Sequence, residues 1–525
     1  GETYGLVGES GQGKTVLALA IQQLLRCPPG KIESGEILLD GQDLLKLKPK
    51  QMQQQIRGKK IAMIFQDPMS CLNPVFTVGQ IMTDVLHTRN PERKKLQVRQ
   101  AALELLQEVK LADAESTMSK YPHQLSGGQR QRVIIALALA CGAEFLIADE
   151  PTRNLDVTIQ ASILKLLKEL QLKRGMTVLF IANNLSLVSA FCDRVGILYG
   201  GKIIEENTTA RLISEPQQDY TKVLIQAVHT EGKKASVIES DEVLLKVEHL
   251  KKYFDINDEI KHQKHLTLKA VDDVSFELKK GEVLGIVGES GCGKSTLVNT
   301  ILDLFEPTEG KVFFEGKDVF AEAKKGDSAF KKNVQIVFQD PGSSLNPYQD
   351  VRSILSLPLK VHNVVPKDQI DDKILEILDM VELPPEFMYK SPNSIGGGEK
   401  QLVSIARALC CNPKFIILDE PTSSLDVSIQ AKIINMLIKL HREQGLTYMF
   451  ITHDMGVMRN VSNRVAIMYL GKICEIAPTE VFYSKPLHPY TQMLLSSIPV
   501  VSDEDEALKP KAVECVGEIP SPVNV

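Results

Sequence analysis

Short apolar runs alternate with longer amphipathic stretches along most of this chain. Continuous apolar runs, typical of parallel strands buried on both faces, occur at residues 60–65, 144–148, 177–181 and 415–418. Charged stretches with helical periodicity, at residues 92–110 and 367–381, predict helices inserted between such strands. The alternation therefore predicts an α/β fold with an inserted helical part.

The same pattern occurs twice. GETYGLVGESG at residues 1–11 returns as GEVLGIVGESG at residues 281–291, and the segments FQDP and DEPT return in the same order about 270 residues later. Because the order is kept and the spacing hardly changes, one domain has been duplicated. We expect a first domain at residues 1–228, a polar linker at 229–242 and a second domain at 243–525.

The second copy has a leader for which the first copy has no counterpart. Residues 243–280 precede the second glycine-rich motif, whereas the chain starts at Gly1, inside the first motif and without an initiator Met. We therefore expect the first domain to be incomplete at its N-terminus.

The amino-acid composition and charge of the chain exclude several classes of protein. Apolar residues make up 43% of the chain and charged residues 24%, as in ordinary globular proteins. Lys and Arg number 61 against 66 Asp and Glu, whereas a nucleic-acid-binding protein usually carries a basic excess. The nine cysteines show no CxxC spacing, and no run of about 20 apolar residues predicts a membrane-spanning helix. We expect a cytosolic protein with reduced thiols.

Two glycine-rich segments carry phosphate-binding chemistry. GESGQGKT at residues 8–15 and GESGCGKS at residues 288–295 fit G-x-x-x-x-G-K-[ST], each between a predicted strand and a predicted helix. Glycines let backbone N–H groups converge on phosphates at a helix N-terminus, where the helix dipole favours anions. The motif's lysine neutralises phosphate and its hydroxyl ligates Mg²⁺. Two chance matches in this context are negligible, so we expect ATP or GTP binding.

A pair of acidic residues follows an apolar strand in each copy. Asp149 and Glu150 end the first of these strands, and Asp419 and Glu420 end the second. From a strand end, the first acid of each pair can reach Mg²⁺, and the second can orient or deprotonate the attacking water. Acidic residues also follow strands simply to enter a turn, but an upstream P-loop in both copies makes that alternative weak.

A third motif identifies a family. QLSGGQR at residues 124–130 lies between the P-loop and the DEPT segment, and the whole set resembles the ABC ATPase signature, twice over essentially the whole chain. The resemblance implies two P-loop NTPase (ABC-type) domains, each a RecA-like parallel-sheet core with an antiparallel β region and an inserted helical subdomain. It also implies that the two ATPase domains pair head to tail, with each ATP and its Mg²⁺ between one P-loop and the opposite signature.

The resemblance also assigns site residues. Gln66 and Gln339 match the Q-loop, which contacts Mg²⁺ and water and adjoins a membrane partner. Phe254 or its neighbour Tyr253 matches the aromatic residue that stacks on adenine, although either could equally belong to the core. The residues expected to act in catalysis are Glu150, Lys294, Gln339, Glu420 and His453. Those expected to bind Mg²⁺ are Thr15, Gln66, Asp149, Ser295, Gln339 and Asp419. Those expected to contact ATP are Gly8, Glu9, Ser10, Gly11, Gly13, Lys14, Thr15, Gln66, Ser126, Gly127, Gly128, Gln129, Phe254, Gly288, Glu289, Ser290, Gly291, Cys292, Gly293, Lys294, Ser295, Thr296, Gln339, Gly397 and Gly398.

The two copies differ at matching positions. The second copy has the family's switch histidine at His453, where the first copy has Asn183. The first copy has an intact LSGGQ at residues 125–129, whereas the second has IGGGE at residues 395–399, which lacks the serine hydroxyl and gains a carboxylate at Glu399.

Under head-to-tail pairing, both losses fall in the site built on Lys14, and the site built on Lys294 keeps every part. Independent drift would produce this convergence about half the time. Arg153 and Asn154, which replace two serines of the second copy, do not fit the division, because the family's loop there faces the opposite P-loop.

A narrower resemblance involves QDPMSCLNP at residues 66–74, QDPGSSLNP at 339–347, PLHPYT at 486–491 and GEIPSP at 517–522. These segments are similar to those of the ATP-binding subunits of peptide/nickel importers. That resemblance implies a peripheral ATPase on the cytoplasmic face of the inner membrane, with two membrane-spanning permease subunits and an extracytoplasmic solute-binding protein as partners, and no nucleic acid. The alternative is a soluble tandem ABC ATPase acting on ribosomes, but such proteins usually carry a long charged helical linker.

Overall fold

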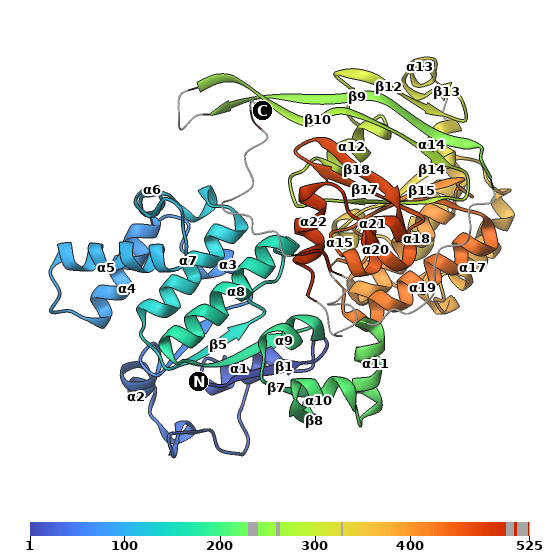
Figure 1. Cartoon of the computed structure of the whole chain (residues 1–525). Coiled ribbons are helices and arrows are strands. Elements are labelled where there is room, and N and C mark those ends of the chain that lie inside the picture. The colour runs from blue at the N-terminus through green and yellow to red at the C-terminus, as the bar shows by residue number, and fades with distance from the viewer. Residues whose placement is uncertain are drawn as a thin grey trace. The chain divides into compact units, whose positions relative to one another are not determined.

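The structure of the chain is a computed structural model (Figure 1). It describes residues 1–228, 240–258, 263–326, 329–423, 425–499, 509–511 and 523. The chain divides into two compact units, whose larger parts are Gly1–Val228 and His229–Ser496. Residues 229–239 of the expected linker and the GEIPSP segment at 517–522 lie outside the described residues.

The first unit is an α/β domain. Its strands are β1 (Thr3–Val7), β2 (Leu38–Leu39), β3 (Gln42–Asp43), β4 (Ile61–Ile64), β5 (Phe145–Asp149), β6 (Thr177–Ala182), β7 (Arg194–Tyr199) and β8 (Lys202–Thr208). Its helices are α1 (Lys14–Ile21), α2 (Pro49–Gln51), α3 (Pro68–Cys71), α4 (Val78–Arg89), α5 (Lys95–Glu108), α6 (Ala114–Ser119), α7 (Gly127–Ala140), α8 (Val157–Arg174), α9 (Leu185–Phe191), α10 (Thr209–Ser214) and α11 (Asp219–Val228). Six strands form a sheet in the order β4-β5-β6-β1-β7-β8, in which only the β7–β8 pair is antiparallel.

The second unit repeats this plan. Its strands are β9 (Val243–Asp258), β10 (Gln263–Lys279), β11 (Val283–Val287), β12 (Glu309–Phe314), β13 (Lys317–Asp318), β14 (Val334–Val337), β15 (Phe415–Asp419), β16 (Thr447–Ile451), β17 (Arg464–Tyr469) and β18 (Lys472–Pro478). Its helices are α12 (Lys294–Ile301), α13 (Val319–Lys324), α14 (Ala329–Asn333), α15 (Pro341–Ser344), α16 (Val351–Val361), α17 (Ile370–Met380), α18 (Gly397–Leu409), α19 (Val427–Gln444), α20 (Met455–Val461), α21 (Thr479–Ser484) and α22 (Pro489–Ser496). The equivalent sheet runs β14-β15-β16-β11-β17-β18.

The predicted α/β class with two parallel-sheet cores is confirmed. The apolar runs form β4, β5, β6 and β15, and the periodic charged stretches contain α5 and α17. In the first unit, α4, α5 and α6 pack against one another, and α4 and α5 also pack against α7, which makes the inserted helical subdomain (Figure 1). Among the described helices, none combines the length and the apolar character needed to cross a membrane.

The antiparallel region differs between the units. In the second unit, β9 and β10 pair over most of their length, and the sheet continues in the order β10-β9-β12-β13. In the described part of the first unit, the separate antiparallel sheet consists only of β2 and β3, of two residues each. The difference follows from the leader at residues 243–280, which supplies both long strands.

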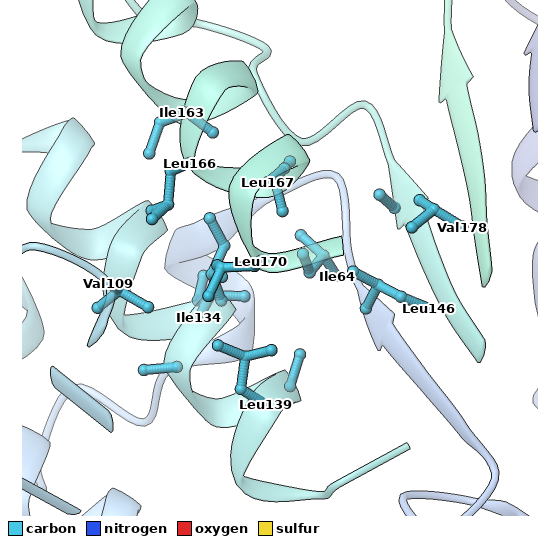
Figure 2. Packing of buried hydrophobic residues seen from close by; sticks show 14 of the residues in the cluster. Ile64, Val109, Ile134, Leu139, Leu146, Ile163, Leu166, Leu167, Leu170 and Val178 are labelled. Atoms are coloured by element: carbon cyan, nitrogen blue, oxygen red, sulfur yellow. The ribbon is translucent and has the colours of Figure 1, made fainter. Parts of the chain in front are cut away.

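The core of the first unit lies between the sheet and the helices α7 and α8. Figure 2 shows Leu166, Leu167 and Leu170 of α8 in one buried cluster with Leu146 and Val178 of the sheet. These side chains are all buried, and α8 is long enough to cover the sheet because it continues for 18 residues before Gly175 ends it with a positive φ.

Shortening Leu166 is expected to destabilise the first unit, whereas the same change at Leu172 is not. Leu166 is 1% exposed, and its truncation leaves a cavity that costs about 2–5 kcal/mol of unfolding free energy. Leu172 lies on the same helix but is 68% exposed, so Leu172→Ala should change stability by no more than about 0.5 kcal/mol. Urea unfolding of both variants measures the difference, and equal losses would contradict this packing.

Candidate nucleotide-binding sites

The predicted site residues gather at one edge of each parallel sheet. In the first unit, β1, β4, β5 and β6 run parallel, so the segments that follow them lie at the same edge. Asp149 is opposite Ile181, and Val7 is opposite Ala182, which brings the acidic pair close to the P-loop. The same arrangement holds for β11, β14, β15 and β16 of the second unit.

Each P-loop wraps around the ammonium group of its own lysine. Lys14 donates from Nζ to the carbonyl oxygens of Gly8 at 2.6 Å and Glu9 at 2.9 Å. Lys294 does the same with Gly288 at 2.6 Å and Glu289 at 3.0 Å. Both lysines are buried, because they begin α1 and α12 at the base of the loop. A positive charge is thereby held at a helix N-terminus, where an anion binds well.

Glycines are required in these loops for two different reasons. A Cβ on Gly8 would lie 2.4 Å from the carbonyl oxygen of Leu198, so this position is a close packing contact. Gly11 and Gly291 have φ values of 82° and 80°, and a Cβ there would meet nothing within 4 Å. These two residues therefore adopt the left-handed conformation beside open space, which leaves room for phosphate groups.

The remaining loop positions follow the expected pattern. Gly13 and Gly293 are the N-caps of α1 and α12, both with positive φ. Exposed side chains belong to Ser10, Ser290 and Ser295, partly exposed ones to Glu9, Thr15 and Thr296, and buried ones to Cys292 and Glu289. The hydroxyl of Thr15 lies near Asp149 at the end of β5, and that of Ser295 lies near Asp419 at the end of β15, since each hydroxyl lowers the pKa of that acid.

The first acid of each pair is buried at its strand end. Burial raises the pKa of Asp149, and burial together with the charge of Glu420 raises the pKa of Asp419 to about 6. No hydrogen bond of good geometry from a described residue reaches either carboxylate oxygen of Asp149, although the nearby Thr15 hydroxyl opposes the rise in its pKa. A buried carboxylate with unused oxygens beside a hydroxyl suits a Mg²⁺ ion, so the residues present fit this cofactor.

The second acid of each pair is held in an unusual backbone conformation. Glu150 and Glu420 have φ values of 45° and 48°, and the backbone N–H of each donates to the strand next to it, at Ile181 and Ile451. Left-handed φ values at residues other than glycine are strained and concentrate at functional sites. Both carboxylates accept a hydrogen bond from the amide of their Q-loop glutamine.

In the second unit, Glu420 lies between an amide and an imidazole. Gln339 donates from Nε2 to Oε2 at 2.8 Å, and His453 Nδ1 lies 3.4 Å from Oε1. Although burial acts in the opposite direction, His453, Lys294 and Ser423 hold the pKa of Glu420 below its usual value. This carboxylate is therefore ionised and directed by two neighbours, as a residue that orients a water molecule must be.

In the first unit, an arginine takes the place of the histidine. Gln66 donates to Oε2 of Glu150 at 2.8 Å, and Arg153 donates from Nη1 to the same oxygen at 2.7 Å. The side-chain oxygen of Asn183 is buried and accepts no hydrogen bond from a described residue. The sequence shows Arg153 where the second copy has Ser423, but its contact with Glu150 requires the turn that the structure reveals.

The two signature segments begin α7 and α18. Ser126 caps α7, since its Oγ accepts from the N–H of Gln129, and Gln129 Oε1 accepts in return from the N–H of Ser126. Gly396 has no side-chain oxygen, and only the second bond remains, from the N–H of Gly396 to Oε2 of Glu399 at 2.7 Å. The added carboxylate is thus folded back onto its own helix N-terminus.

The glycines after the cap are not equivalent to one another. Gly127 is partly exposed and Gly397 exposed, whereas Gly128 and Gly398 are buried. A Cβ on Gly128 would lie 2.8 Å from a methyl group of Ile159, so this glycine permits α7 to approach α8 closely.

The aromatic candidates lie on β9. Phe254 packs edge-on against Phe305, with 5.8 Å between ring centroids, and the ammonium of Lys252 lies 5.0 Å from the Phe254 ring. The hydroxyl of Tyr253 donates to Asp272. Phe254 is half-buried, and its ring is already in contact with neighbours on the unit itself.

A phosphate-binding loop, a buried acid at a strand end on the same edge of the sheet and a directed glutamate define each unit as a P-loop NTPase. The sequence matches the family described as ABC transporter over residues 1–153 and 271–423, and residues 474–520 match the oligopeptide/dipeptide transporter C-terminal region. The chain belongs to the ABC transporter family, as a fused pair of ATP-binding domains of the oligopeptide/dipeptide type with ABC-type ATPase activity.

Curated relatives match along the whole chain. The Glutathione import ATP-binding protein GsiA of Escherichia coli (strain K12) is 40% identical over 100% of this chain and 88% of its own length. The protein of the same name from Pectobacterium atrosepticum is 39% identical over the same shares. The solved dimeric structure of the ATP-binding cassette MJ0796, in a post-hydrolysis state bound to ADP and Pi, is 31% identical over 45% of this chain and 99% of that chain, with a TM-score of 0.40. The relatives give no support to the ribosome-acting alternative.

Removing the cap of α7 is expected to lower stability measurably. Ser126→Ala leaves the N–H of Gln129 without its acceptor and should cost about 1 kcal/mol of unfolding free energy, whereas Ser126→Thr keeps a hydroxyl at the cap and most of the stability. Thermal unfolding of the two variants compares them directly. A loss of the same size in Ser126→Thr would show that the hydroxyl does not act as a cap.

Proposed function

We propose that this chain is the ATP-hydrolysing subunit of an importer for peptides or related small solutes such as glutathione. The support is the whole-chain similarity to relatives named for glutathione import and the match to the oligopeptide/dipeptide transporter C-terminal region. Two membrane-spanning permease subunits and an extracytoplasmic solute-binding protein are its partners in this proposal. The chain then works as a peripheral subunit at the cytoplasmic face of the inner membrane.

The arrangement around Glu420 is the observation that carries the ATPase assignment in the second unit. Gln339 and His453 each contact one of the two carboxylate oxygens, and Lys294 lies at the P-loop, where the phosphate chain is proposed to bind. Glu420 then orients the attacking water, Lys294 neutralises charge on the β- and γ-phosphates, and His453 contacts the γ-phosphate. Phe254 is the candidate for stacking on the nucleotide base, and ATP is the proposed substrate because the relatives are named as ATP-binding proteins.

Mg²⁺ is held by Thr15, Asp149 and Gln66 in the first site and by Ser295, Asp419 and Gln339 in the second. When bound, this ion neutralises charge that develops on the phosphates during transfer. The buried carboxylates of Asp149 and Asp419 favour such a site, because a divalent cation offsets the cost of burying each negative charge.

The two sites differ in what they do. We take the P-loop of each unit to face the signature of the other, so the site of Lys294 uses the intact signature at Ser126, and the site of Lys14 uses Gly396 and Glu399. Arg153 adds a second reason for a weak first site. In the second unit, Gln339 and His453 contact different oxygens of Glu420. In the first unit, Gln66 and Arg153 both donate to the same oxygen of Glu150, so that oxygen is less available to accept a hydrogen bond from water.

Hydrolysis is therefore expected to occur mainly at the site of Lys294. Glu420→Gln should abolish nearly all steady-state ATPase activity, a loss on the order of 10²–10³-fold, because it removes the group that orients water at the complete site. Glu150→Gln should leave most of the activity. A phosphate-release assay on the full chain with its membrane partners measures both variants.

Equal losses from the two substitutions would contradict the asymmetry. A gain-of-function test complements them in the Glu420→Gln background, where Asn183→His, Arg153→Ser, Gly396→Ser and Glu399→Gln together restore the missing parts of the weak site. Activity above that of Glu420→Gln alone is expected. The absence of any gain would show that other differences between the copies matter more.

The segments after each Q-loop glutamine are expected to contact the permeases. Met69 on α3 is 46% exposed, and Ser343 on α15 is also exposed, so both are available to a partner. Cysteines introduced at Met69 and Ser343 should form crosslinks with cysteines on cytoplasmic loops of the permease subunits. Cysteine at the exposed Leu172 of α8 is the matched control and should not. No crosslink at either Q-loop position would remove the importer assignment.

A further inference from the structure

The PLHPYT motif at residues 486–491 has no part in the site described above, yet it reaches the phosphate-binding loop. Tyr490 is the second residue of α22, and this helix lies beside β17 and β18 (Figure 1). Its hydroxyl donates to Oε2 of Glu289 at 3.3 Å and accepts from the backbone N–H of Glu289 at 3.4 Å. Both side chains are buried, at 7% and 3% exposure.

The motif is held firmly in the unit. The carboxylate of Glu475 on β18 accepts the backbone N–H groups of Leu487 at 2.9 Å and His488 at 3.0 Å. The ring of Tyr490 packs against that of Tyr469 at the end of β17, with 4.2 Å between centroids and the ring planes inclined by 34°. Tyr490 therefore has little freedom to move, and its hydroxyl group is held in one position next to the P-loop.

Glu289 connects the Tyr490 hydroxyl to Lys294. Its carbonyl oxygen accepts from Lys294 Nζ, so a displacement of Glu289 also displaces the ammonium group that meets phosphate. Its carboxylate is a buried negative charge close to an anion-binding loop, and such a charge needs a donor. Burial and the charge of Glu289 raise the pKa of Tyr490, which keeps the hydroxyl protonated and able to donate.

The first unit offers a natural comparison. The rings of Tyr220 and Tyr199 pack together there in the same way, with 4.4 Å between centroids and the ring planes inclined by 38°. Glu9 occupies the position of Glu289, but its Oε1 is buried and accepts no hydrogen bond from a described residue. The hydrogen bond between the tyrosine and the P-loop glutamate is thus found in the unit that has the complete set of site residues.

We infer that Tyr490 is a positioning residue for the phosphate-binding loop of the second unit, through which the PLHPYT motif sets the affinity of that site for ATP. The inference rests on the proposed ATP binding at Lys294. Tyr490 acts through Glu289 and touches no nucleotide, so the expected effect is on binding more than on turnover. The hydrogen bonds are long for a hydroxyl, and a moderate effect follows.

The test measures binding of Mg²⁺ and the fluorescent analogue N-methylanthraniloyl-ATP to the full chain carrying Lys14→Ala, so that the second site is reported alone. Tyr490→Phe should weaken binding about fivefold. In the ATPase assay of the chain with native Lys14, the same variant should raise the KM for ATP by a similar factor and change kcat by less than about twofold. In a Glu289→Gln background, Tyr490→Phe should change the affinity by less than about twofold, since the buried charge is gone.

Tyr448→Phe is the matched control. Tyr448 is equally buried, and its hydroxyl donates to the carbonyl oxygen of Leu437 at 3.2 Å, between β16 and α19. It should lose thermal stability without any change in nucleotide affinity. Weakening of the same size in Tyr448→Phe, or unchanged affinity in Tyr490→Phe, would overturn the inference.

Two further outcomes are also decisive. If Tyr490→Phe does not fold, Glu475→Gln, which loosens the loop at Leu487 and His488, takes its place in the same assay and must weaken binding. If the Lys14→Ala parent binds no nucleotide at all, the proposed ATP site fails, and the inference about Tyr490 fails with it for that separate reason.

Discussion

The site depends on burying a lysine ammonium group at the carboxyl edge of a parallel sheet. A buried cation is costly unless polar groups surround it, and the glycine-rich loop supplies carbonyl oxygens at 2.6 Å and 3.0 Å from Lys294. The cation then favours a carboxylate nearby, and Asp419 lies at the end of β15, separated from β11 by β16 alone. Burial of Asp419 in turn favours a divalent metal ion. Each feature of the site thus follows from the position of the lysine.

The same constraint explains why the two units differ where they do. The P-loop and the first acid are kept in both, since losing either would leave the other as an unmatched buried charge. The second acid is only partly buried, so its partner can vary without a large cost in stability. In the second unit the partner is His453, and in the first unit it is Arg153.

The sequence was sufficient to predict the duplicated α/β fold, because its signals are local. Apolar runs mark strands, and the P-loop and DEPT residues lie within a few positions of a strand end. The contacts between distant residues could not be read in this way. Tyr490 and Glu289 are 201 residues apart, and their bond depends on how α22 packs against the sheet. Arg153 is visible in the sequence, where the family resemblance placed it opposite the P-loop of the other unit. Its contact with Glu150 of its own unit depends on the local turn, in which Glu150 has a positive φ. The larger antiparallel sheet of the second unit, by contrast, contains residues 243–280, which the sequence already shows as a leader with no counterpart in the first copy.

Three differences from the second unit occur together in the first unit. Independent drift of the two copies therefore becomes a weaker explanation. Asn183 has no imidazole, Arg153 occupies the carboxylate of Glu150, and Glu9 has a buried oxygen that receives no hydrogen bond from a described residue. The signature at Ser126, however, keeps both bonds of its cap. In the proposed head-to-tail arrangement, that signature serves the P-loop of the other unit. This combination agrees with the proposed asymmetry, in which the first unit contributes its signature to the site of the second.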